Sequence, residues 1–523
     1  MLLDSEIVTA AQMRAIESAA ISSGNVTGAR LMERAGRAVV DAVMKTWPRY
    51  AGAGPAGPWR ALVLCGPGNN GGDGFVIARL LAEAGWSVEV NMLGKPEDLP
   101  LDARAAHDRW LMIGPVGRIP HIGLIQTDLL VDALFGIGLT RPVEGALADL
   151  FEDIAEAQGN LFCGPRSPGI DDLVSVDVPS GLCAESGRVL DAGRDACIRA
   201  DLTVTFHHPK PGHLLADGPL ICGELVVADI GLRPRPTGEP PLRIARFTAR
   251  PKRHGHKYDH GHALILTGPA GRGGAARLAA RAALRIGAGL VTMGCPGDAL
   301  AELAAPPDAL MRRVVEDAGG LREMLADRRI GALCLGPGMG IGRAAGLLPA
   351  ALDSGRPCVL DADALSALAA RDDPFAGLHP GCVLTPHLGE FARLFPDLAR
   401  RLAGPAETGP AFSKLEAARQ AAARSGAALL LKGPDTVIAA PDGAAWIHSA
   451  YDVPWLATAG AGDVLAGMIA GLLARGIAAP EAAAGAAALH AAAARHFGPG
   501  LIADDLPEQI PALLRGAGMP GGG

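Results

Sequence analysis

The sequence lacks the marks of a secreted or membrane-bound protein. Its nine cysteines are scattered and never form a C-x-x-C pair, which fits a reducing compartment and gives no zinc signature. The first residues, MLLDSEIVTAAQMRAIE, carry acids from Asp4 onward and lack a basic segment followed by an apolar one, so they do not resemble a signal peptide. The best candidate for a membrane span, residues 464–474, falls well short of the ~20 residues that a span needs. We therefore expect a cytoplasmic protein with no membrane partner.

An excess of positive charge is also absent. The formal net charge is −7, which gives no general reason to expect nucleic acid as a partner. Hydrophobic residues make up 49% and charged residues 20%, a composition typical of folded rather than disordered chains. A length of 523 residues is too great for one ordinary domain and predicts two large domains or three small ones.

The first half of the chain alternates helix and strand patterns. Helices are expected over residues 9–22 and 29–47, where apolar side chains recur at helical spacing. Short apolar runs typical of buried parallel strands follow at 61–65, 129–133, 173–178 and 202–206. A Gly-rich loop follows the first of these runs and leads into a helical pattern at 75–84. This alternation predicts a parallel, layered α/β sheet.

A Pro-rich stretch, residues 233–251, predicts the boundary between two domains. Beyond it the strand–loop–helix pattern restarts with ALILTG, and further buried strands are expected at 332–335, 358–360, 382–384 and 428–431. The sequence thus predicts two layered α/β domains, over residues 1–240 and 250–515, whose motifs differ. Residues 159–172 have the composition of a surface insertion in the first domain.

The first motif that indicates chemistry is GPGNNGGDG, residues 66–74, between a predicted strand and a predicted helix. Its glycines let the backbone approach a ligand, and free N–H groups at a helix start favour an anion such as phosphate. The spacing also matches the dinucleotide fingerprint of a redox Rossmann domain, with Glu89 where the ribose-binding acid belongs. That alternative leaves Asn69, Asn70 and Asp73 unexplained, because a plain turn needs about one such polar side chain.

Two further predicted strands end in polar side chains. Asp132 closes LLVDA, and Asp177 and Ser180 lie in VDVPSGL. Ligands of open α/β sheets collect at the carboxyl ends of the strands, so we expect these residues to share one site with residues 69–73. Each aspartate taken singly fits a helix cap or a turn residue equally well. Oxygen donors of this kind suit a hard cation and do not demand a transition metal.

In this order, NNGGDG, VDALFGIGL, VDVPSGL, TFHHPKPGHL and VADIGL resemble the NAD(P)HX epimerase domain, a Rossmann-like fold, over residues 9–232. The resemblance implies a nucleotide site lined by Asn69, Asn70, Gly71, Gly72, Asp73, Gly136, Ile137, Gly138, Leu139, Thr140, Arg141, Pro142 and Asp177. It also implies a potassium ion held by Asn70, Asp132 and Ser180. Asp132 and Asp177 are both candidates for the catalytic acid/base, and the sequence does not decide between them. Ile137 stands where the family usually has a small hydroxylic residue.

In the second half, the motif TAGAGDVLAGMIAGLLA opens an apolar helix with Gly460 and Gly462, and Asp463 lies in its first turn. N–H groups at a helix N-terminus stabilise a transferring phosphoryl group, and an aspartate beside them can accept a proton from an attacking hydroxyl. An aspartate there is more often a simple helix cap, but a cap does not require the glycines. LGPGMG, LTPHLGE and LKGPDT follow other predicted strands. Taken alone, His387 fits an ordinary turn histidine and Lys432 a solvated lysine.

These motifs, together with HKYDHGHALILTG, GGAARLAARAALRIGAGLV and VLDADAL, resemble the NAD(P)HX dehydratase domain, which has a ribokinase-like fold, over residues 254–497. The resemblance implies that the hydrated nicotinamide nucleotide contacts Ala275, Gly338, His387 and Asp463. It implies an adenine-nucleotide site formed by Lys432, Gly433, Pro434, Asp435, Thr436 and Gly462. The loop PAGRGG lacks the aromatic residue often found before GAA in this family.

The resemblance implies a bifunctional repair enzyme for hydrated NADH and NADPH. The first domain would interconvert the R and S epimers of NAD(P)HX. The second would dehydrate the S epimer with ADP as co-substrate and magnesium as cofactor, giving AMP and phosphate. ADP rather than ATP rests on the resemblance alone, and we also expect a homo-oligomer. Two alternatives remain open: another kinase of the ribokinase-like group, and a non-catalytic scaffold related to RNA-decapping proteins, against which the unbroken NNGGDG and VDVPSG argue.

Overall fold

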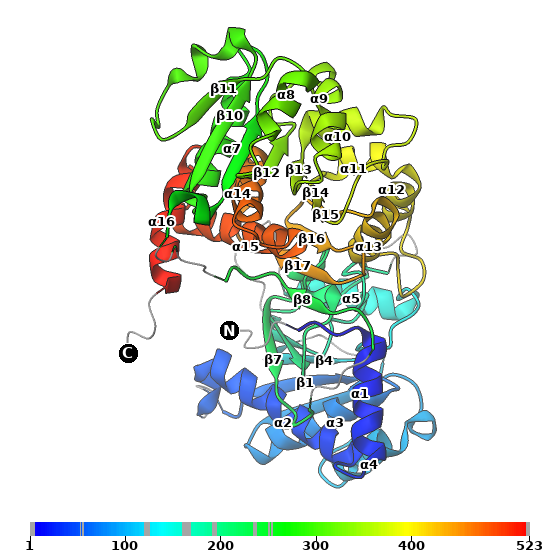
Figure 1. Cartoon of the computed structure of the whole chain (residues 1–523). Coiled ribbons are helices and arrows are strands. Elements are labelled where there is room, and N and C mark those ends of the chain that lie inside the picture. The colour runs from blue at the N-terminus through cyan, green and yellow to red at the C-terminus, as the bar shows by residue number, and fades with distance from the viewer. Residues whose placement is uncertain are drawn as a thin grey trace. The chain divides into compact units, whose positions relative to one another are not determined.

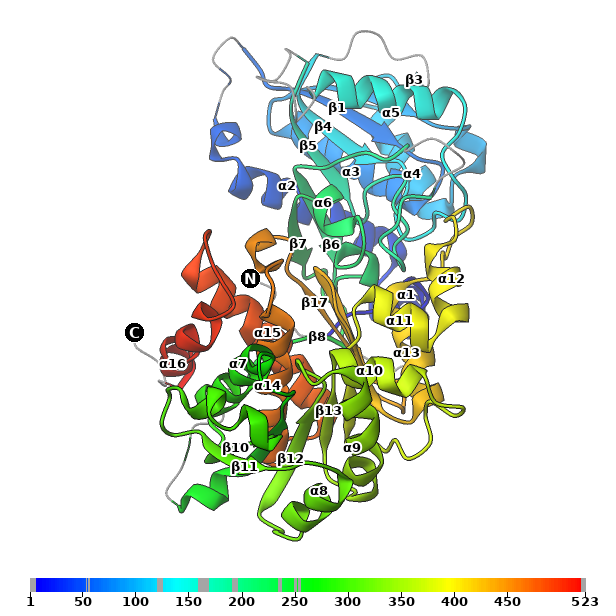
Figure 2. The same ribbon diagram turned by 90° about the horizontal axis from the view of Figure 1, so that it is seen from above.

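The structure, a computed structural model, describes residues 6–52, 54, 57–119, 126–158, 169–190, 196–233, 238–248, 252 and 255–518. Two compact units make up the chain, each around its own sheet (Figure 1, Figure 2). The first unit comprises Met1–Glu239 and Gly404–Ser413, and the second comprises Pro240–Ala403 and Lys414–Gly523.

The first unit contains a parallel sheet with the strand order β3-β2-β1-β4-β5-β6-β7. Its strands are β1 (Arg60–Cys65), β2 (Ser87–Met92), β3 (Gly117–Arg118), β4 (Thr127–Ala133), β5 (Ile170–Val176), β6 (Leu202–Phe206) and β7 (Glu224–Ala228). Its helices are α1 (Ala10–Ser22), α2 (Gly28–Thr46), α3 (Asn69–Glu83), α4 (Leu101–Leu111), α5 (Ala146–Ala157) and α6 (Gly218–Ile221). The strand order reverses direction between β1 and β4, and open α/β sheets bind ligands outside the carboxyl ends of strands at such a point.

Both faces of this sheet are covered by helices, which explains the unbroken apolar run of residues 61–65 in β1. Side chains alternate between the faces along a strand. Val63 and Val131 belong to the core that α2 and α3 cover, whereas Leu62 and Leu130 pack with Phe151 of α5. Such two-sided burial is typical of parallel sheets.

The second unit contains a mixed sheet with the strand order β11-β10-β9-β12-β13-β14-β15-β16-β17-β8. Its strands are β8 (Leu242–Ile244), β9 (His262–Leu266), β10 (Leu290–Cys295), β11 (Met311–Val314), β12 (Ile330–Leu335), β13 (Cys358–Leu360), β14 (Cys382–Leu384), β15 (Ala428–Leu431), β16 (Asp435–Ala439) and β17 (Ala445–Ser449). Its helices are α7 (Gly273–Arg285), α8 (Ala318–Leu325), α9 (Ile341–Asp353), α10 (Ala362–Ala369), α11 (Leu388–Leu394), α12 (Pro396–Ala403), α13 (Lys414–Ser425), α14 (Ala461–Ala474), α15 (Ala479–Phe497) and α16 (Asp505–Gly518). Strands β16 and β17 are antiparallel to their neighbours β15 and β16.

The helix α14, which begins at the predicted catalytic motif, is packed closely against α7. A Cβ added to Gly467 would lie 2.0 Å from the carbonyl oxygen of Ala279 in α7, so only glycine fits at this crossing. Residues Val464, Ala466 and Met468 are fully buried in the core of this unit. The tight contact fixes the N-terminus of α14 relative to the sheet.

The predicted strands at 202–206, 358–360, 382–384 and 428–431 are confirmed with the same bounds. The prediction for residues 233–251 is corrected in part, because β8 lies inside this Pro-rich stretch and pairs with β17, where Leu242 is buried. Helix α3 begins at Asn69 and not near Phe75, because the glycines that resemble a loop allow close packing. A Cβ on Gly72 would lie 2.5 Å from the Met32 side chain of α2.

Residues 159–168 of the predicted insertion lie outside the described residues. None of the helices in the described ranges is both long and apolar enough to span a membrane. The cysteines in these ranges are free and buried.

Candidate active sites

The first candidate site lies at the carboxyl ends of β1, β4, β5 and β6. The Asp132 carboxylate is fully buried there, directly beside Ser175 on the next strand. It accepts four hydrogen bonds, from Ser175 Oγ at 2.9 Å, Ser180 N at 2.9 Å, Ser180 Oγ at 2.6 Å and Leu134 N at 3.3 Å. Burial raises the pKa of Asp132, although these hydrogen bonds oppose the rise. The structure thus brings Asp132 and Ser180 together, and Asp132 ties the ends of β4 and β5 to the following loops.

Asp177 follows β5 in a different environment. Its φ of 65° is a left-handed conformation that costs a non-glycine residue about 1–3 kcal/mol and that clusters at functional sites. Its Oδ1 atom accepts hydrogen bonds from Thr205 Oγ1 at 2.8 Å and from Lys210 Nζ at 2.7 Å. Burial opposes ionisation, but the Lys210 charge outweighs it and holds the pKa of Asp177 below its ordinary value. Asp177 is therefore a carboxylate at neutral pH.

Two more acidic side chains lie within electrostatic reach of Asp177. Asp73 is the fifth residue of α3, and its pKa is raised well above the ordinary value by burial and by the charges of Asp177 and Glu17. The pKa of Glu17, on α1, is raised by burial and by Asp177. One ionised and one neutral carboxyl group near each other are the arrangement of an acid/base pair.

The loop after β4 meets Asn70 and Asp177 at Gly136. Asn70 Oδ1 and Asp177 Oδ2 both lie 3.2 Å from the point where a Cβ on Gly136 would stand. Two acceptor oxygens therefore converge there. The amide nitrogen of Asn70 is buried without a hydrogen-bond partner among the described residues. Asn70 thus brings an unused hydrogen-bond donor to the site that residues 136–142, the loop after β4, are predicted to line.

This loop is anchored by two residues from distant parts of the sequence. Arg14 Nη1 donates to the carbonyl of Ile137 at 3.3 Å, and Gly409 N donates to the carbonyl of Thr140 at 3.0 Å. Gly409 belongs to the Gly404–Ser413 segment of the first unit. Both contacts use the backbone carbonyls of this loop. They therefore do not depend on the side chain at position 137, where Ile137 departs from the family pattern.

The second candidate site lies at the carboxyl ends of β12 to β15 and at the N-terminus of α14. Gly460 is the N-cap residue, with a φ of 89°, and no side chain caps this helix among the described residues. Asp463 is therefore not a plain helix cap. Burial raises the pKa of Asp463 to about 6, with Asp361 and Asp363 adding to the rise and Lys432 opposing it.

Lys432 follows β15 and is charged, because the acids around it raise its pKa more than burial lowers it. Its Nζ atom donates to Asp361 Oδ1 at 2.8 Å and lies 3.7 Å from Glu390 Oε2. Thr385 Oγ1 donates to the same Asp361 oxygen at 2.8 Å. Lys432 Nζ is also 3.6 Å from the point where a Cβ on Gly462 would stand, so the structure brings these two predicted nucleotide-site residues together.

Lys414, which is buried, fixes residues 432–436, the loop that is predicted to bind the adenine nucleotide. Lys414 Nζ donates to Asp435 Oδ1 at 2.6 Å and to the carbonyl of Lys432 at 3.2 Å. Thr436 Oγ1 donates to the carbonyl of Gly433 at 2.7 Å. These contacts hold the loop in one conformation at the end of the sheet.

His387 is the N-cap residue of α11. Its Nδ1 atom accepts hydrogen bonds from Gly389 N at 3.0 Å and Glu390 N at 3.3 Å, and 55% of its side chain is exposed. These contacts match the ordinary turn histidine that the sequence left open. A role in substrate binding therefore stays a prediction.

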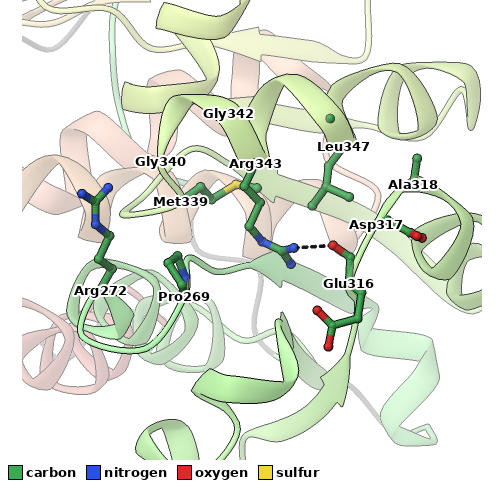
Figure 3. Close-up of a pocket in the computed structure, with 11 residues that line it drawn as sticks. Pro269, Arg272, Glu316, Asp317, Ala318, Met339, Gly340, Gly342, Arg343 and Leu347 are labelled. Carbon is green, nitrogen blue, oxygen red and sulfur yellow. Dashed lines mark hydrogen bonds between the residues drawn. The ribbon is translucent and has the colours of Figure 1, made fainter.

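The turn Gly338–Gly340 lies beside α7 and is hydrogen-bonded to Asp363, one of the acids that raise the pKa of Asp463. Ala275 Cβ is 3.3 Å from the point where a Cβ on Gly338 would stand, so these two predicted substrate contacts are neighbours. Gly340 N donates to Asp363 Oδ2 at 2.8 Å. A pocket of about 480 Å³ adjoins this turn, between Pro269, Arg343 and the residues around Asp317 (Figure 3).

The pocket is shaped by Arg343, whose guanidinium donates to the carbonyls of Thr267, Val315 and Glu316 at 2.7–2.9 Å. Figure 3 shows the bond to Glu316. Asp463 does not line the pocket. The pocket therefore marks a route to the Gly338–Gly340 turn and not the carboxylate cluster itself.

Sequence reasoning assigned no role to several residues that complete the two sites. In the first site these are Glu17, Thr205, Lys210 and His213, and in the second they are Asp361, Asp363, Thr385, Glu390 and Lys414. Three of the quoted motifs, TFHHPKPGHL, VLDADAL and LTPHLGE, contain part of this set and could have indicated it. In the described part of the chain, no three His, Cys, Asp or Glu side chains are grouped as a metal site.

Comparison with protein families gives two matches. Residues 28–212 match the model of the YjeF-related protein N-terminus, and residues 263–511 match the model of NAD(P)H-hydrate dehydratase. The first match lies within the first unit, and the second covers most of the second unit together with the Gly404–Ser413 segment of the first.

Relatives are similar over the whole length. The bifunctional NAD(P)H-hydrate repair enzyme Nnr of Moorella thermoacetica is 36% identical over 549 residues, covering 97% of this chain and 96% of that protein. The NAD(P)H-hydrate epimerase of Roseobacter litoralis is 44% identical over 244 residues, which is 43% of this chain and 99% of that protein.

Among solved structures, the ADP/ATP-dependent NAD(P)H-hydrate dehydratase of Bacillus subtilis, co-crystallised with ATP and Mg²⁺, is 28% identical. It covers 51% of this chain and 95% of its own, with a TM-score of 0.44. The two family matches and the full-length relatives show that the chain belongs to the family of bifunctional NAD(P)H-hydrate repair enzymes, with an epimerase domain in its N-terminal unit and an NAD(P)H-hydrate dehydratase domain in its C-terminal unit.

Proposed function

We propose that Asp177 moves the proton in epimerisation and that Asp463 is the base of an ADP-dependent dehydration. In this proposal the N-terminal unit interconverts the R and S epimers of NAD(P)HX, and the C-terminal unit returns the S epimer to NAD(P)H. The observation that carries it is the electrostatic setting of these two aspartates. Lys210 keeps Asp177 ionised, and burial beside other acids brings the pKa of Asp463 to about 6.

Asp177 suits proton transfer better than Asp132, the other candidate. Both oxygens of Asp132 are occupied by hydrogen bonds from Ser175, Ser180 and Leu134. Asp177 uses Oδ1 for its protein contacts, while Oδ2 lies towards Gly136 and Asn70. Asp73, whose pKa is raised by burial and by neighbouring negative charge, is the proposed partner acid.

In dehydration, Asp463 accepts the proton of the ring hydroxyl while the hydroxyl oxygen attacks the terminal phosphate of ADP, and AMP leaves. The oxygen is then part of a phosphate, which is a far better leaving group than hydroxide. Loss of phosphate and of a ring proton restores the double bond, so the products are NAD(P)H, AMP and phosphate. The N–H groups after Gly460 and the Lys432 charge stabilise the developing negative charge.

Potassium is proposed for the first site, held by Asn70, Asp132 and Ser180. These are oxygen donors, one of them charged, which is a chemistry that fits a hard cation. Ser180 donates two hydrogen bonds to Asp132, so a bound ion would share or replace those contacts. A bound potassium ion would offset part of the diphosphate charge. Titrating potassium against the epimerase rate of the wild type and of Asp132→Ala tests this. Both the rate and its potassium dependence should fall in the variant, and an epimerase indifferent to potassium removes the ion.

Magnesium is proposed for the second site. Lys432 and Thr385 both donate to Oδ1 of Asp361, so Oδ2 of Asp361 and the carboxylates of Asp363 and Asp463 are the oxygens that would hold it. Mg²⁺ is commonly held by one or two carboxylates and the substrate phosphates, which fits this donor set. When bound, it neutralises phosphate charge. A cytoplasmic location and a homo-oligomeric state remain predictions, and the latter is checked by light scattering.

The assay that tests the proposed function uses acid-hydrated NADH with ADP. NADH absorbance should rise, and AMP and phosphate should form in equal amounts with the NADH. A kinase of the same fold would instead leave phosphate on its product. The proposal is contradicted if no phosphate is released, or if ADP is consumed without formation of NADH.

A further inference from the structure

Lys210 is the charged residue most completely enclosed in the first unit's site. Its side chain has no exposed surface. Its Nζ atom donates to Asp177 Oδ1 and to Thr205 Oγ1, both at 2.7 Å, and to the carbonyl of Phe206 at 3.3 Å. These three contacts use all three N–H donors of an ammonium group. Lys210 therefore has none left for a substrate.

The backbone around Lys210 is fastened to the same aspartate. Lys210 N donates to His213 Nδ1 at 3.0 Å, which leaves the proton on His213 Nε2. Nε2 in turn donates to the carbonyl oxygen of Asp177 at 2.9 Å. The pKa of His213 is lowered to about 4 by burial and by the Lys210 charge, which keeps this ring neutral and this tautomer in place. Both the main chain and the side chain of residue 177 are thus held from one short segment.

The hydrogen bonds to Asp177 are divided unevenly between its two carboxylate oxygens. Oδ1 accepts from Lys210 and Thr205, and Thr205 also accepts from Lys210, so the three side chains form a closed triangle. No hydrogen bond from the described residues reaches Oδ2, which lies towards Gly136 at the predicted nucleotide loop. The carboxylate is fixed by one oxygen, and the other is available.

We propose that Lys210 is a positioning residue of the epimerase, which holds Asp177 by Oδ1 so that Oδ2 faces the ring of the substrate. The inference rests on the proposed role of Asp177 as the residue that moves the proton. A fixed carboxylate matters because a misplacement of about 1 Å can cost 10²-fold in rate. Thr205 supports the same oxygen with a neutral hydrogen bond.

A purely structural ion pair is the competing interpretation, and the same strand provides a matched case. Asp172, near the start of β5, is also buried and is held by Arg49 and by Tyr50, whose Oη donates to it at 2.5 Å. Asp172 lies at the opposite end of β5 from Asp177. Arg49→Met therefore removes the charged partner of a buried aspartate in the same unit without touching the site.

The experiment measures epimerisation alone, by separating the R and S epimers after incubation without ADP. For Lys210→Met we expect kcat to fall about 10²-fold with KM little changed. Lys210→Gln should lose less, because its amide can still donate to Oδ1, and it decides the matter if Lys210→Met does not fold. For Arg49→Met we expect a lower Tm with kcat unchanged.

The inference is overturned if folded Lys210 variants keep the wild-type kcat or lose activity through KM alone. It is also overturned if Arg49→Met, for an equal fall in Tm, loses as much kcat as the Lys210 variants do. Asp177→Asn, in the same assay, separates this inference from the proposed function. If Asp177→Asn stays active, the proposed base is wrong; if it is inactive while the Lys210 variants keep kcat, only the positioning role is wrong.

Discussion

The two sites use the same components with opposite electrostatic results. Each lies at the carboxyl ends of parallel strands, and each pairs a lysine with a strand-end aspartate. In the first site Lys210 is bound to Asp177, the proposed proton carrier itself. In the second site Lys432 is bound to Asp361, a neighbour of the proposed base Asp463.

This difference teaches that the partner of the lysine decides which carboxyl group titrates near neutral pH. Asp177 stays ionised because its own lysine lowers its pKa. Asp463 faces Asp361 and Asp363 and has a pKa of about 6. The left-handed backbone conformation also falls on different residues in the two sites. In the first site it is Asp177 itself, whereas in the second it is Ala362, which lies between Asp361 and Asp363 and has a φ of 45°.

The largest expected effect comes from removing one base at a time. Asp463→Asn should lower the dehydration rate by ~10²–10⁴-fold, since a general base contributes that much. Epimerisation of the same variant, followed without ADP, should stay at the wild-type rate. NADH regeneration at near the wild-type rate would show that Asp463 is not the base.

The mirror variant is Asp177→Asn. Its epimerisation rate should fall by ~10²–10⁴-fold, while ADP-dependent dehydration of the purified S epimer persists. The two rates are measured on one preparation, so that protein quality is the same in both. A variant that loses both activities together would break the separation between the sites.

The pH dependence should differ between the two activities. The proposed base of dehydration must be ionised to accept a proton, and its pKa is about 6, so kcat/KM should fall about tenfold per pH unit below pH 6. Epimerisation should persist to lower pH, because Lys210 lowers the pKa of Asp177. Profiles of kcat/KM between about pH 4.5 and about pH 8, which bracket the Asp463 pKa of about 6, check this. Coincident acid limbs would contradict it.

A smaller effect concerns the boundary between the units. A piece that starts at residue 250 lacks β8, whereas one that starts at residue 240 keeps it and keeps Leu242, which is 4% exposed. Loss of a buried leucine costs at least about 2 kcal/mol, which corresponds to roughly 4–8 °C in a domain of this size. The Tm of piece 240–523 should therefore exceed that of piece 250–523. Equal Tm values would show that β8 adds nothing to the second sheet.

Much of the fold was predictable because buried parallel strands are visible in a sequence as short apolar runs. Strands β6, β13, β14 and β15 were predicted with their bounds, and all are buried on both faces. Strand β8 was missed because three residues among prolines carry too little pattern. The antiparallel β16 was missed because its start, Asp435, lies in a motif assigned to nucleotide binding.

The sites were predictable to the extent that their residues lie in glycine-rich motifs at strand ends. Asp132 and Ser180 are in contact, and Gly462 lies beside Lys432. The lysine partners were not predictable, because Lys210 is 33 residues from Asp177 and only the packing of β6 beside β5 brings them together. Hydrogen-bond saturation, which separates Asp132 from Asp177, likewise appears only in three dimensions.

The most direct test of two separate sites is complementation between the two variants. Asp177→Asn and Asp463→Asn are each incubated with the purified R epimer and ADP, alone and mixed, and NADH absorbance is followed. Each variant alone should regenerate NADH only at the rate that spontaneous epimerisation or residual activity permits. The mixture should approach the wild-type rate, because one protein supplies the S epimer that the other dehydrates. A mixture no faster than the better single variant would contradict the account.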